Sequence, residues 1–382
     1  MQKNHFMTHK NKINYLILLF ASFSLSLFSQ ESPKIKLGGA LRFNYNYSNW
    51  QDEGNDLGGE FVYDVFRLNA NGSYKNLILD AEYRFYASSS GGAMLKHGWV
   101  GYNFNSEHQL QVGLNIVPFG IMPYNSNNWF FNINYYIGLE DDADMGVKYI
   151  YTTSEWDVAV AFYKNSDIIN PHGEISSSRY SYDIAGKNKE VNQGNIRISR
   201  KFGNEMFNHE LGLSGQIGGI YNINTREIGS RSAFAAHYVL NAGKFNLKAQ
   251  YTTYNISPKN EEGANINFVE MGAYGANYNV ATKADTYTLG LAYNIPVNKG
   301  ILDNIIVYND FGLMKKRADN TNNSHQNVTG MMFTMGPIYT YLDYALGKNH
   351  AWLGGSWMDS FANGLEDEDW HARLNLNIGY YF

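Results

Sequence analysis

The basic side chains of this chain recur at alternate positions within runs that are otherwise apolar. In segment 77–85, apolar residues occupy every odd position, while Asp80, Glu82 and Arg84 stand between them. Successive side chains of a strand point to opposite faces, so such a segment has one apolar and one charged face. If the apolar face looks outward from a closed barrel, eight basic residues point into its lumen: Arg42, Arg67, Arg84, Lys148, Arg197, Lys201, Lys248 and Arg373.

Acidic residues at inward positions are fewer: Asp80, Glu82, Asp157 and Asp343. Other acids crowd the presumed loops, so the pore wall is predicted to be basic although the chain carries a net charge of -5. An arginine ladder in a narrow, partly dehydrated channel lowers the barrier that an entering anion meets. The alternative is that these arginines only neutralise the inward carboxylates and the wall carbonyls.

Two acidic clusters suggest Ca²⁺ as a ligand, because hard cations prefer carboxylate oxygens. One is Glu140-Asp141-Asp142 with Asp144, and the other is Glu366-Asp367-Glu368-Asp369. Neither has the spacing of an EF-hand. We therefore expect solvated loop charge, with no metal ion and no cofactor.

Catalytic motifs are missing from the sequence. It contains no cysteine and no HExxH, GxSxG or GxxxxGK[ST] pattern, so thiolate, zinc-protease, esterase-elbow and P-loop chemistry have no support. Separate strands could still assemble a hydrolase site from His97, His237, His371 and Ser232. We expect no enzymatic activity.

A long connection, 118–143, is rich in aromatic residues, which would be an aggregation hazard if it were exposed. We expect it to fold into the barrel and narrow the channel; the alternative is an outward loop packed on neighbouring loops or on another subunit. Its candidate constriction residues are Pro118, Phe119, Gly120, Trp129, Tyr135, Glu140, Asp141 and Asp142.

The elements that must position these residues are strands of roughly 9–11 residues, the length that crosses a bilayer when tilted. We predict an all-β transmembrane antiparallel barrel, with both ends of the chain in the periplasm. Short turns alternate with long loops, as in outer-membrane barrels. Phe268 to Val280 could form an additional strand of its own. The segment around Pro337 could be one long strand instead of two. About sixteen strands are expected to begin near residues 35, 61, 76, 94, 108, 145, 155, 193, 208, 231, 244, 282, 303, 328, 338 and 369.

The composition agrees with a membrane barrel. Aromatic residues make up 15% of the chain and charged residues only 17%, against about 25% charged in ordinary globular domains. The last strand alternates through Leu374, Leu376, Ile378 and Tyr380 to the terminal Phe382, and an aromatic residue there suits the interfacial girdle. The rival fold is an exported soluble β-sandwich or solenoid.

The first residues have the pattern of an export signal. Lys3, Lys10 and Lys12 precede an apolar run from Tyr15 to Phe28, which predicts a signal peptide at 1–29 and one barrel domain at 30–382. A single membrane anchor is the alternative. Loss of the three lysines takes the net charge from -5 to about -8, which argues against nucleic acid as a partner.

Several motifs resemble the phosphate-selective porin O/P-type family, in the form common in Bacteroidetes outer membranes. The similarity runs through most of the chain beyond the signal. It implies a 16-stranded trimeric porin of a Gram-negative outer membrane, an inward third loop, and anion or phosphate uptake along lumen arginines and lysines. The motifs are Val117-Pro118-Phe119-Gly120, Tyr136 to Asp141, Gly146-Val147-Lys148-Tyr149, Tyr308-Asn309-Asp310, Gly336-Pro337-Ile338-Tyr339, Asp343 to Asn349 and Gly379-Tyr380-Tyr381-Phe382.

The leading hypothesis is therefore a passive porin for small hydrophilic solutes, embedded in outer-membrane lipid. The second hypothesis is a structural or assembly barrel within a larger outer-membrane complex, since the aromatic loops could be docking surfaces.

Overall fold

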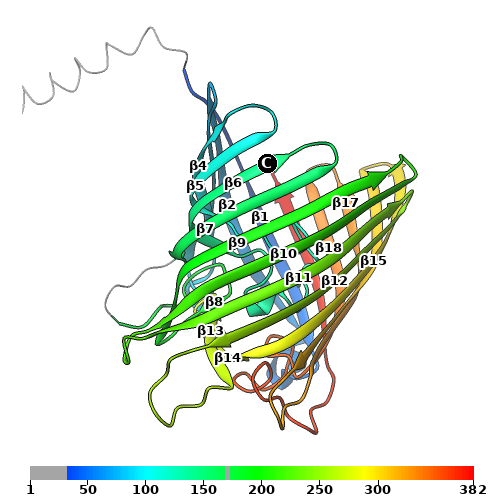
Figure 1. Cartoon of the computed structure of the whole chain (residues 1–382). Coiled ribbons are helices and arrows are strands. Elements are labelled where there is room, and N and C mark those ends of the chain that lie inside the picture. Colours follow the sequence, from blue (N-terminus) through cyan, green and yellow to red (C-terminus); the bar gives the residue numbers. More distant parts are fainter. Residues whose placement is uncertain (1–31, 168–172) are drawn as a thin grey trace, which may run out of the picture.

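The computed structural model describes residues 32–167 and 173–382, and within them sixteen strands form one closed antiparallel barrel (Figure 1). Each barrel strand pairs with the next along the chain, and β1 closes the ring against β19 from Ala40↔Tyr381 to Ser48↔Arg373. The barrel strands are β1 (Lys34–Ser48), β2 (Glu60–Tyr74), β3 (Leu77–Phe85), β4 (Ala93–Asn103), β5 (His108–Ile116), β6 (Ala143–Thr152), β7 (Trp156–Ser166), β9 (Asn188–Gly203), β10 (Phe207–Asn222), β11 (Ile228–Ala242), β12 (Phe245–Ser257), β15 (Lys283–Lys299), β16 (Leu302–Lys316), β17 (Ser324–Met335), β18 (Ile338–Lys348) and β19 (His371–Tyr381).

The predicted strand count is confirmed, and every strand begins within five residues of its expected start. The segment after Phe268 is not a barrel strand. It forms a hairpin of β13 (Phe268–Ala273) and β14 (Ala276–Ala281), which pairs with the short β8 (Asp183–Ile184). A turn at Gly336 and Pro337 separates β17 from β18. The predicted signal peptide lies outside the described residues and stays a prediction.

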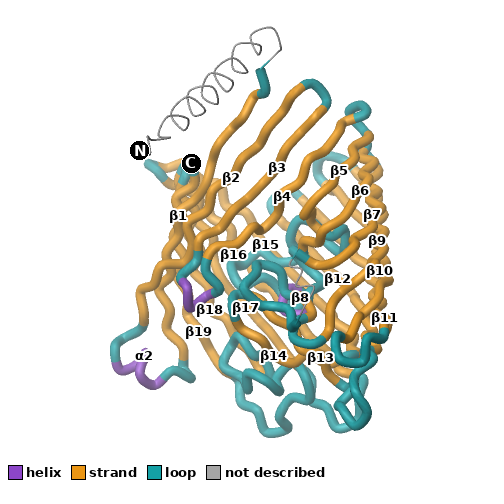
Figure 2. Tube along the Cα trace, turned by 90° about the vertical axis from the view of Figure 1, so that its left-hand side faces the viewer, coloured by secondary structure: helices purple, strands orange, loops and turns teal. Residues whose placement is uncertain are grey.

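The two ends of the barrel differ in their connections (Figure 2). Short turns join strands at the end where β1 begins and β19 ends, and long loops join them at the other. The loops that matter below are L3 (117–142, with a 3-10 turn at Tyr135–Ile137), L4 (167–187), L6 (258–282) and L8 (349–370). L1 (49–59) carries the short helix α2 (Asp52–Asp56), and L2 (86–92) carries a 3-10 turn at Ser88–Ser90. Among the described residues, no helix has the length and apolar character to span a membrane.

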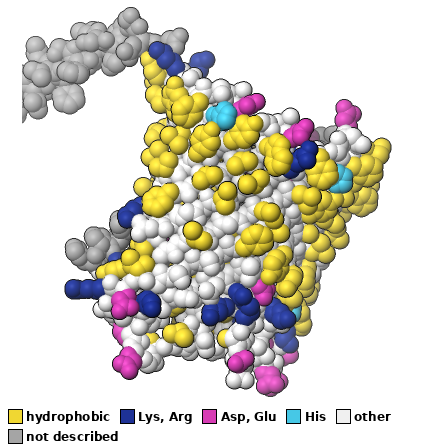
Figure 3. All heavy atoms as spheres, viewed as in Figure 1, with side chains coloured by type: hydrophobic (Ala, Val, Ile, Leu, Met, Phe, Trp, Pro, Cys, Tyr) yellow, Lys and Arg dark blue, Asp and Glu magenta, His cyan; other side chains and the backbone are white. Residues whose placement is uncertain are grey.

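The outer wall of the barrel is apolar, as the alternation predicts. In β19, Leu374, Ile378 and Tyr380 are exposed while Asn375 and Asn377 are buried on the inner face. Figure 3 shows hydrophobic side chains over the barrel wall, with charged side chains gathered toward its ends. This band is what the hydrocarbon layer of a bilayer requires of a barrel surface.

Aromatic side chains from four loops pack against one another inside the barrel at its long-loop end. Tyr135 and Tyr136 of L3 make ring contacts with Tyr182 of L4, which in turn contacts Tyr274 of L6 and Trp352 of L8. Because side chains from all four loops share this cluster, the loops support one another in fixed positions.

Candidate channel site

A cavity of about 730 Å³ lies inside the barrel between L3 and one side of the wall. The wall side is formed by β1, β2, β3, β18 and β19, and the opposite side by residues 124–136 of L3. Four of the eight basic residues predicted to face inward line it: Arg42, Arg67, Arg84 and Arg373. Most other lining side chains are tyrosines, tryptophans and asparagines.

Three of these arginines are paired with carboxylates of neighbouring strands. Arg42 Nε lies 2.8 Å from Asp64 Oδ2. Glu82 forms ion pairs with two arginines. Its carboxylate lies 2.5 Å from Arg84 Nε and 3.4 Å from Arg67 Nη1. Among the charged side chains that line the cavity and their ion-pair partners, four guanidinium groups thus face two carboxylates, so the cavity lining carries an excess of positive charge.

The fourth arginine, Arg373, has no carboxylate within ion-pair distance among the described residues. Its Nε donates to Asn46 Oδ1 at 3.2 Å, and its guanidinium lies 5.7 Å from the ring centre of Phe130 in L3. Arg84 similarly lies 4.4 Å from the ring centre of Tyr180. Stacking on aromatic rings holds these cations in place without neutralising them.

L3 occupies its position because its backbone is bonded to the inner wall strand after strand. Gly120 N donates to Ser214 Oγ on β10, and Ile121 N donates to Gln250 Oε1 on β12. Farther along, Asp310 on β16 accepts four hydrogen bonds of 2.7–3.1 Å, two each from Asn127 and Asn128. The loop therefore lies along the inner wall opposite the arginines, and the cavity lies between the loop and β1–β3.

Three other predicted basic residues bind backbone carbonyls near L3 and do not line the cavity. Arg197 Nε donates to Gly120 O at 2.8 Å, Lys148 Nζ to Ile116 O at 2.7 Å, and Lys248 Nζ to Ser126 O at 2.8 Å. Arg197 is also paired with Asp157 and Glu210. Lys201 is exposed near the short-turn end of β9.

Gly120 shows why the loop needs glycine where it leaves β5. Its φ is +62°, and a Cβ at this position would stand 2.5 Å from the Gln250 side-chain oxygen. Both the left-handed backbone and the close approach to β12 exclude larger residues. The buried neighbours Pro118 and Phe119 complete this bend.

The expectation that the first acidic cluster is solvated is wrong. Glu140, Asp141, Asp142 and Asp144 are all buried, with exposed fractions of 1–9%. Asp141 is paired with Lys96 Nζ at 2.9 Å and accepts from Tyr180 Oη at 2.6 Å. The reason is that L3 turns inward, so that charges in the loop meet the wall and L4 rather than water. In the second cluster, Glu366, Asp367 and Asp369 are exposed.

Glu140 has little of the support that Asp141 receives. Its Oε1 accepts the backbone N–H of Asn125 at 2.9 Å, while its Oε2 has no hydrogen-bond donor among the described residues. Burial raises the pKa of Glu140, and the hydrogen bond from Asn125 lowers it. The effect of burial is the larger, so the pKa rises to about 8.

Sequence reasoning missed two charged residues of the site, Asp64 and Lys96, and both stand at β-bulges. The register of β1 with β2 passes from Arg42↔Val65 to Phe43↔Tyr63 and leaves Asp64 unpaired. The register of β3 with β4 skips Lys96 in the same way. A bulge turns an extra side chain inward, which strict alternation does not anticipate.

The pieces of a possible hydrolase site are not brought together. His97 lies beside Asp80, His237 beside Glu210 and His371 beside Glu368, on three different parts of the wall. Ser232 is exposed, whereas His237 on the same strand is buried.

No protein-family model matches this chain, and no curated protein matches its sequence. Solved structures share the fold. OmpT, an outer-membrane protein of Vibrio cholerae solved in a trimer form, has a TM-score of 0.58 at 12% identity, covering 92% of this chain and 100% of that one. The anion-selective porin of Comamonas acidovorans has a TM-score of 0.57 at 13% identity, with coverages of 92% and 100%. The outer-membrane channel DcaP of Acinetobacter baumannii has a TM-score of 0.56 at 12% identity, covering 92% of this chain and 98% of that one. The fold is therefore that of porin-type barrels.

Proposed function

We propose that this protein is an outer-membrane porin through which small hydrophilic solutes diffuse passively, with a preference for anions. The observation that carries the proposal is the cavity between L3 and the wall, where four arginines face two carboxylates. Excess positive charge in a narrow lumen raises the local concentration of anions and lowers their barrier to passage.

The proposed path runs along the arginine wall. Arg84 and Arg67 share Glu82, so a passing anion meets guanidinium groups whose positions are already fixed by ion pairs and ring contacts. Arg373 has no carboxylate within ion-pair distance among the described residues, so no ion pair offsets its positive charge along this path. Guanidinium groups suit oxyanions such as phosphate, because their fork of N–H donors matches two oxygens at once.

We further propose that the long-loop end faces the outside of the cell, that both chain ends lie in the periplasm, and that the protein is a homotrimer. The apolar outer wall supports a membrane setting. The porin-type neighbours, one of them named as anion-selective and one solved as a trimer, support the same assignment.

Single-channel recording of the purified protein in planar bilayers tests the proposal. We expect stepwise conductance, in triplets if the trimer inserts as a unit. A barrel that inserts but never conducts would contradict a porin. If such a silent barrel also copurified with other membrane proteins at fixed stoichiometry, an assembly role would be favoured.

A further inference from the structure

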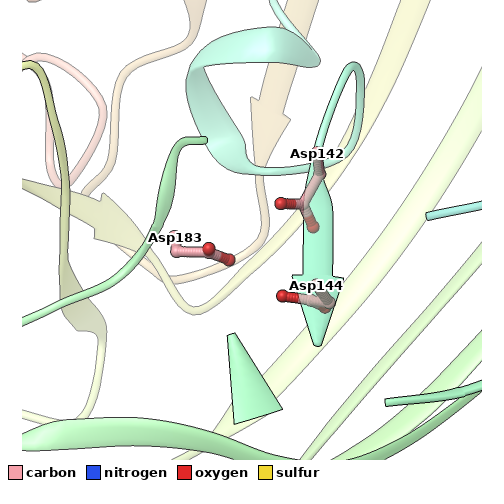
Figure 4. Close-up of side chains that lie close together, drawn as sticks. All are labelled: Asp142, Asp144 and Asp183. Carbon is pink, nitrogen blue, oxygen red and sulfur yellow. The ribbon is translucent and has the colours of Figure 1, made fainter. Parts of the chain in front are cut away.

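Three buried aspartates converge where L3 meets the barrel wall and L4 (Figure 4). Asp142 is the last residue of L3, and Asp144 is the second residue of β6, so the extended chain puts both side chains on one side. Asp183 comes from β8, forty residues farther on. One carboxylate oxygen from each of the three lies within 4.8 Å of the others.

Five of the six oxygens of these carboxylates accept no hydrogen bond from the described residues. Neither oxygen of Asp142 or Asp183 accepts a hydrogen bond from the described residues, and only one oxygen of Asp144 does, from Gln193 at 3.1 Å. Asp142 is 4% exposed, Asp144 1% and Asp183 0%. A bare buried carboxylate is costly, so such a group is normally paired, protonated or bound to a metal.

Nearby arginines do not balance the cluster. Arg231 is bonded to Glu190, and Arg179 lies 2.9 Å from Asp167 and 3.3 Å from Asp183. Within the described part of the chain, the guanidinium groups of Arg179 and Arg231 therefore lie among five carboxylates. These are the three aspartates of the cluster together with Asp167 and Glu190. Asp183 shares Arg179 with Asp167, whereas Asp142 and Asp144 form no ion pair with either arginine among the described residues.

The spacing suits a calcium ion. Ca²⁺ binds oxygens at about 2.3–2.6 Å, so two ligands on opposite sides of the ion stand roughly 5 Å apart. Oxygens within 4.8 Å of one another can therefore all reach one ion. The oxygen-only donor set excludes the softer metals that prefer nitrogen or sulfur.

We propose that Asp142, Asp144 and Asp183 bind one Ca²⁺ that fastens the end of L3 and the β8 segment of L4 to the barrel wall. This departs from the sequence-based expectation of no metal site. Ser181 already links the same elements, because its Oγ accepts the N–H of Ala143 at 3.0 Å. The ion would hold the two loops where they border the cavity.

Cation binding to the purified, chelator-treated protein tests this inference. Calorimetric titration of the wild-type protein with CaCl₂ should show one saturable site per chain, with a dissociation constant of about 1 mM or below. Ca²⁺ should also raise the thermal unfolding midpoint. Asp142→Asn/Asp183→Asn should weaken binding by about tenfold or more, because affinity follows the number of charged ligands.

Glu366→Gln/Asp367→Asn in the exposed part of L8 is the matched control, since it removes the same charge elsewhere and should bind Ca²⁺ like the wild type. Asp144→Asn serves as a second variant if the double variant does not fold. Lanthanide anomalous scattering from wild-type crystals locates the site without any substitution. No saturable binding by the wild type, a lanthanide outside the three aspartates, or unchanged affinity in the folded site variants would overturn the proposal.

Discussion

The guanidinium Nε of Arg42 lies 2.8 Å from Asp64 Oδ2, across adjacent strands of the cavity wall. Both side chains are largely buried, with exposed fractions of 16% and 8%. The pair exists because a bulge in β2 turns Asp64 inward. The positive wall is therefore not a bare ladder but a set of arginines partly offset by carboxylates.

The Arg42–Asp64 pair should control ion selectivity through its net charge. Arg42→Gln leaves Asp64 unpaired, so the anion-to-cation permeability ratio should fall, on the order of twofold. Asp64→Asn should raise the ratio, because Arg42 is then no longer offset. The reversal potential of single channels in a salt gradient measures both changes.

The double variant Arg42→Gln/Asp64→Asn is the matched control for this pair. It removes one charge of each sign, so its reversal potential should lie close to that of the wild type. If both single variants and the double variant gave the wild-type potential, the pair would not face the ions.

Arg373 should contribute to anion passage although it has no carboxylate partner among the described residues. Arg373→Gln keeps a donor for Asn46 but removes the charge beside Phe130. Chloride conductance at low salt should fall, and the loss should shrink at high salt, where charge is screened. Arg200→Gln, at an exposed arginine paired with Glu155, should leave conductance unchanged. Equal effects of the two variants would refute a specific role for Arg373.

Asp310 should hold L3 against the wall. Asp310→Ala removes the acceptor of four hydrogen bonds from Asn127 and Asn128, which should lower the free energy of unfolding by about 3 kcal/mol. Single-channel currents should become larger or noisier as the loop is released. Asp319→Ala, at an exposed position of the neighbouring loop, is the control. A quiet channel of wild-type conductance would show that other contacts suffice.

Glu140 should make stability fall with rising pH. Its folded pKa of about 8 exceeds the unfolded value of 4.5, so between these values the unfolded chain releases a proton that the folded protein keeps. The free energy of unfolding therefore decreases from about pH 4.5 to pH 8, by a few kcal/mol at most. Urea titrations in detergent across this range measure the slope.

Glu140→Gln supplies the comparison for that slope. The amide oxygen can still accept from Asn125 N, but the side chain no longer ionises. As pH rises from about 4.5 to 8, the free energy of unfolding of the variant should therefore increase relative to that of the wild type. Parallel pH profiles of the two proteins would show that Glu140 does not carry the effect.

Alternation of apolar residues was sufficient to predict the barrel, because one face of every strand must meet lipid. The strand starts follow from the same pattern and from turns such as Gly336 and Pro337. The hairpin after Phe268 could not be distinguished from a wall strand. Its burial alternates as in a wall strand, with Val269 and Met271 buried and Phe268 and Glu270 half-buried. Its partner β8 is a two-residue strand from another loop.

The site was only partly accessible from sequence. Period-two alternation identified the four arginines of the cavity, but not Asp64 and Lys96, because bulges break the period locally. It also could not show that Lys148, Arg197 and Lys248 bind backbone carbonyls near L3. That depends on where a long loop lies in space, which no local pattern encodes.

The central claim is that anions pass along the arginine wall, and the reversal potential of the wild-type channel in a KCl gradient tests it most directly. We predict a potential of the sign that marks anion preference, with chloride conductance reduced when phosphate is added. A potential near zero, or of the sign that marks cation preference, would contradict the claim.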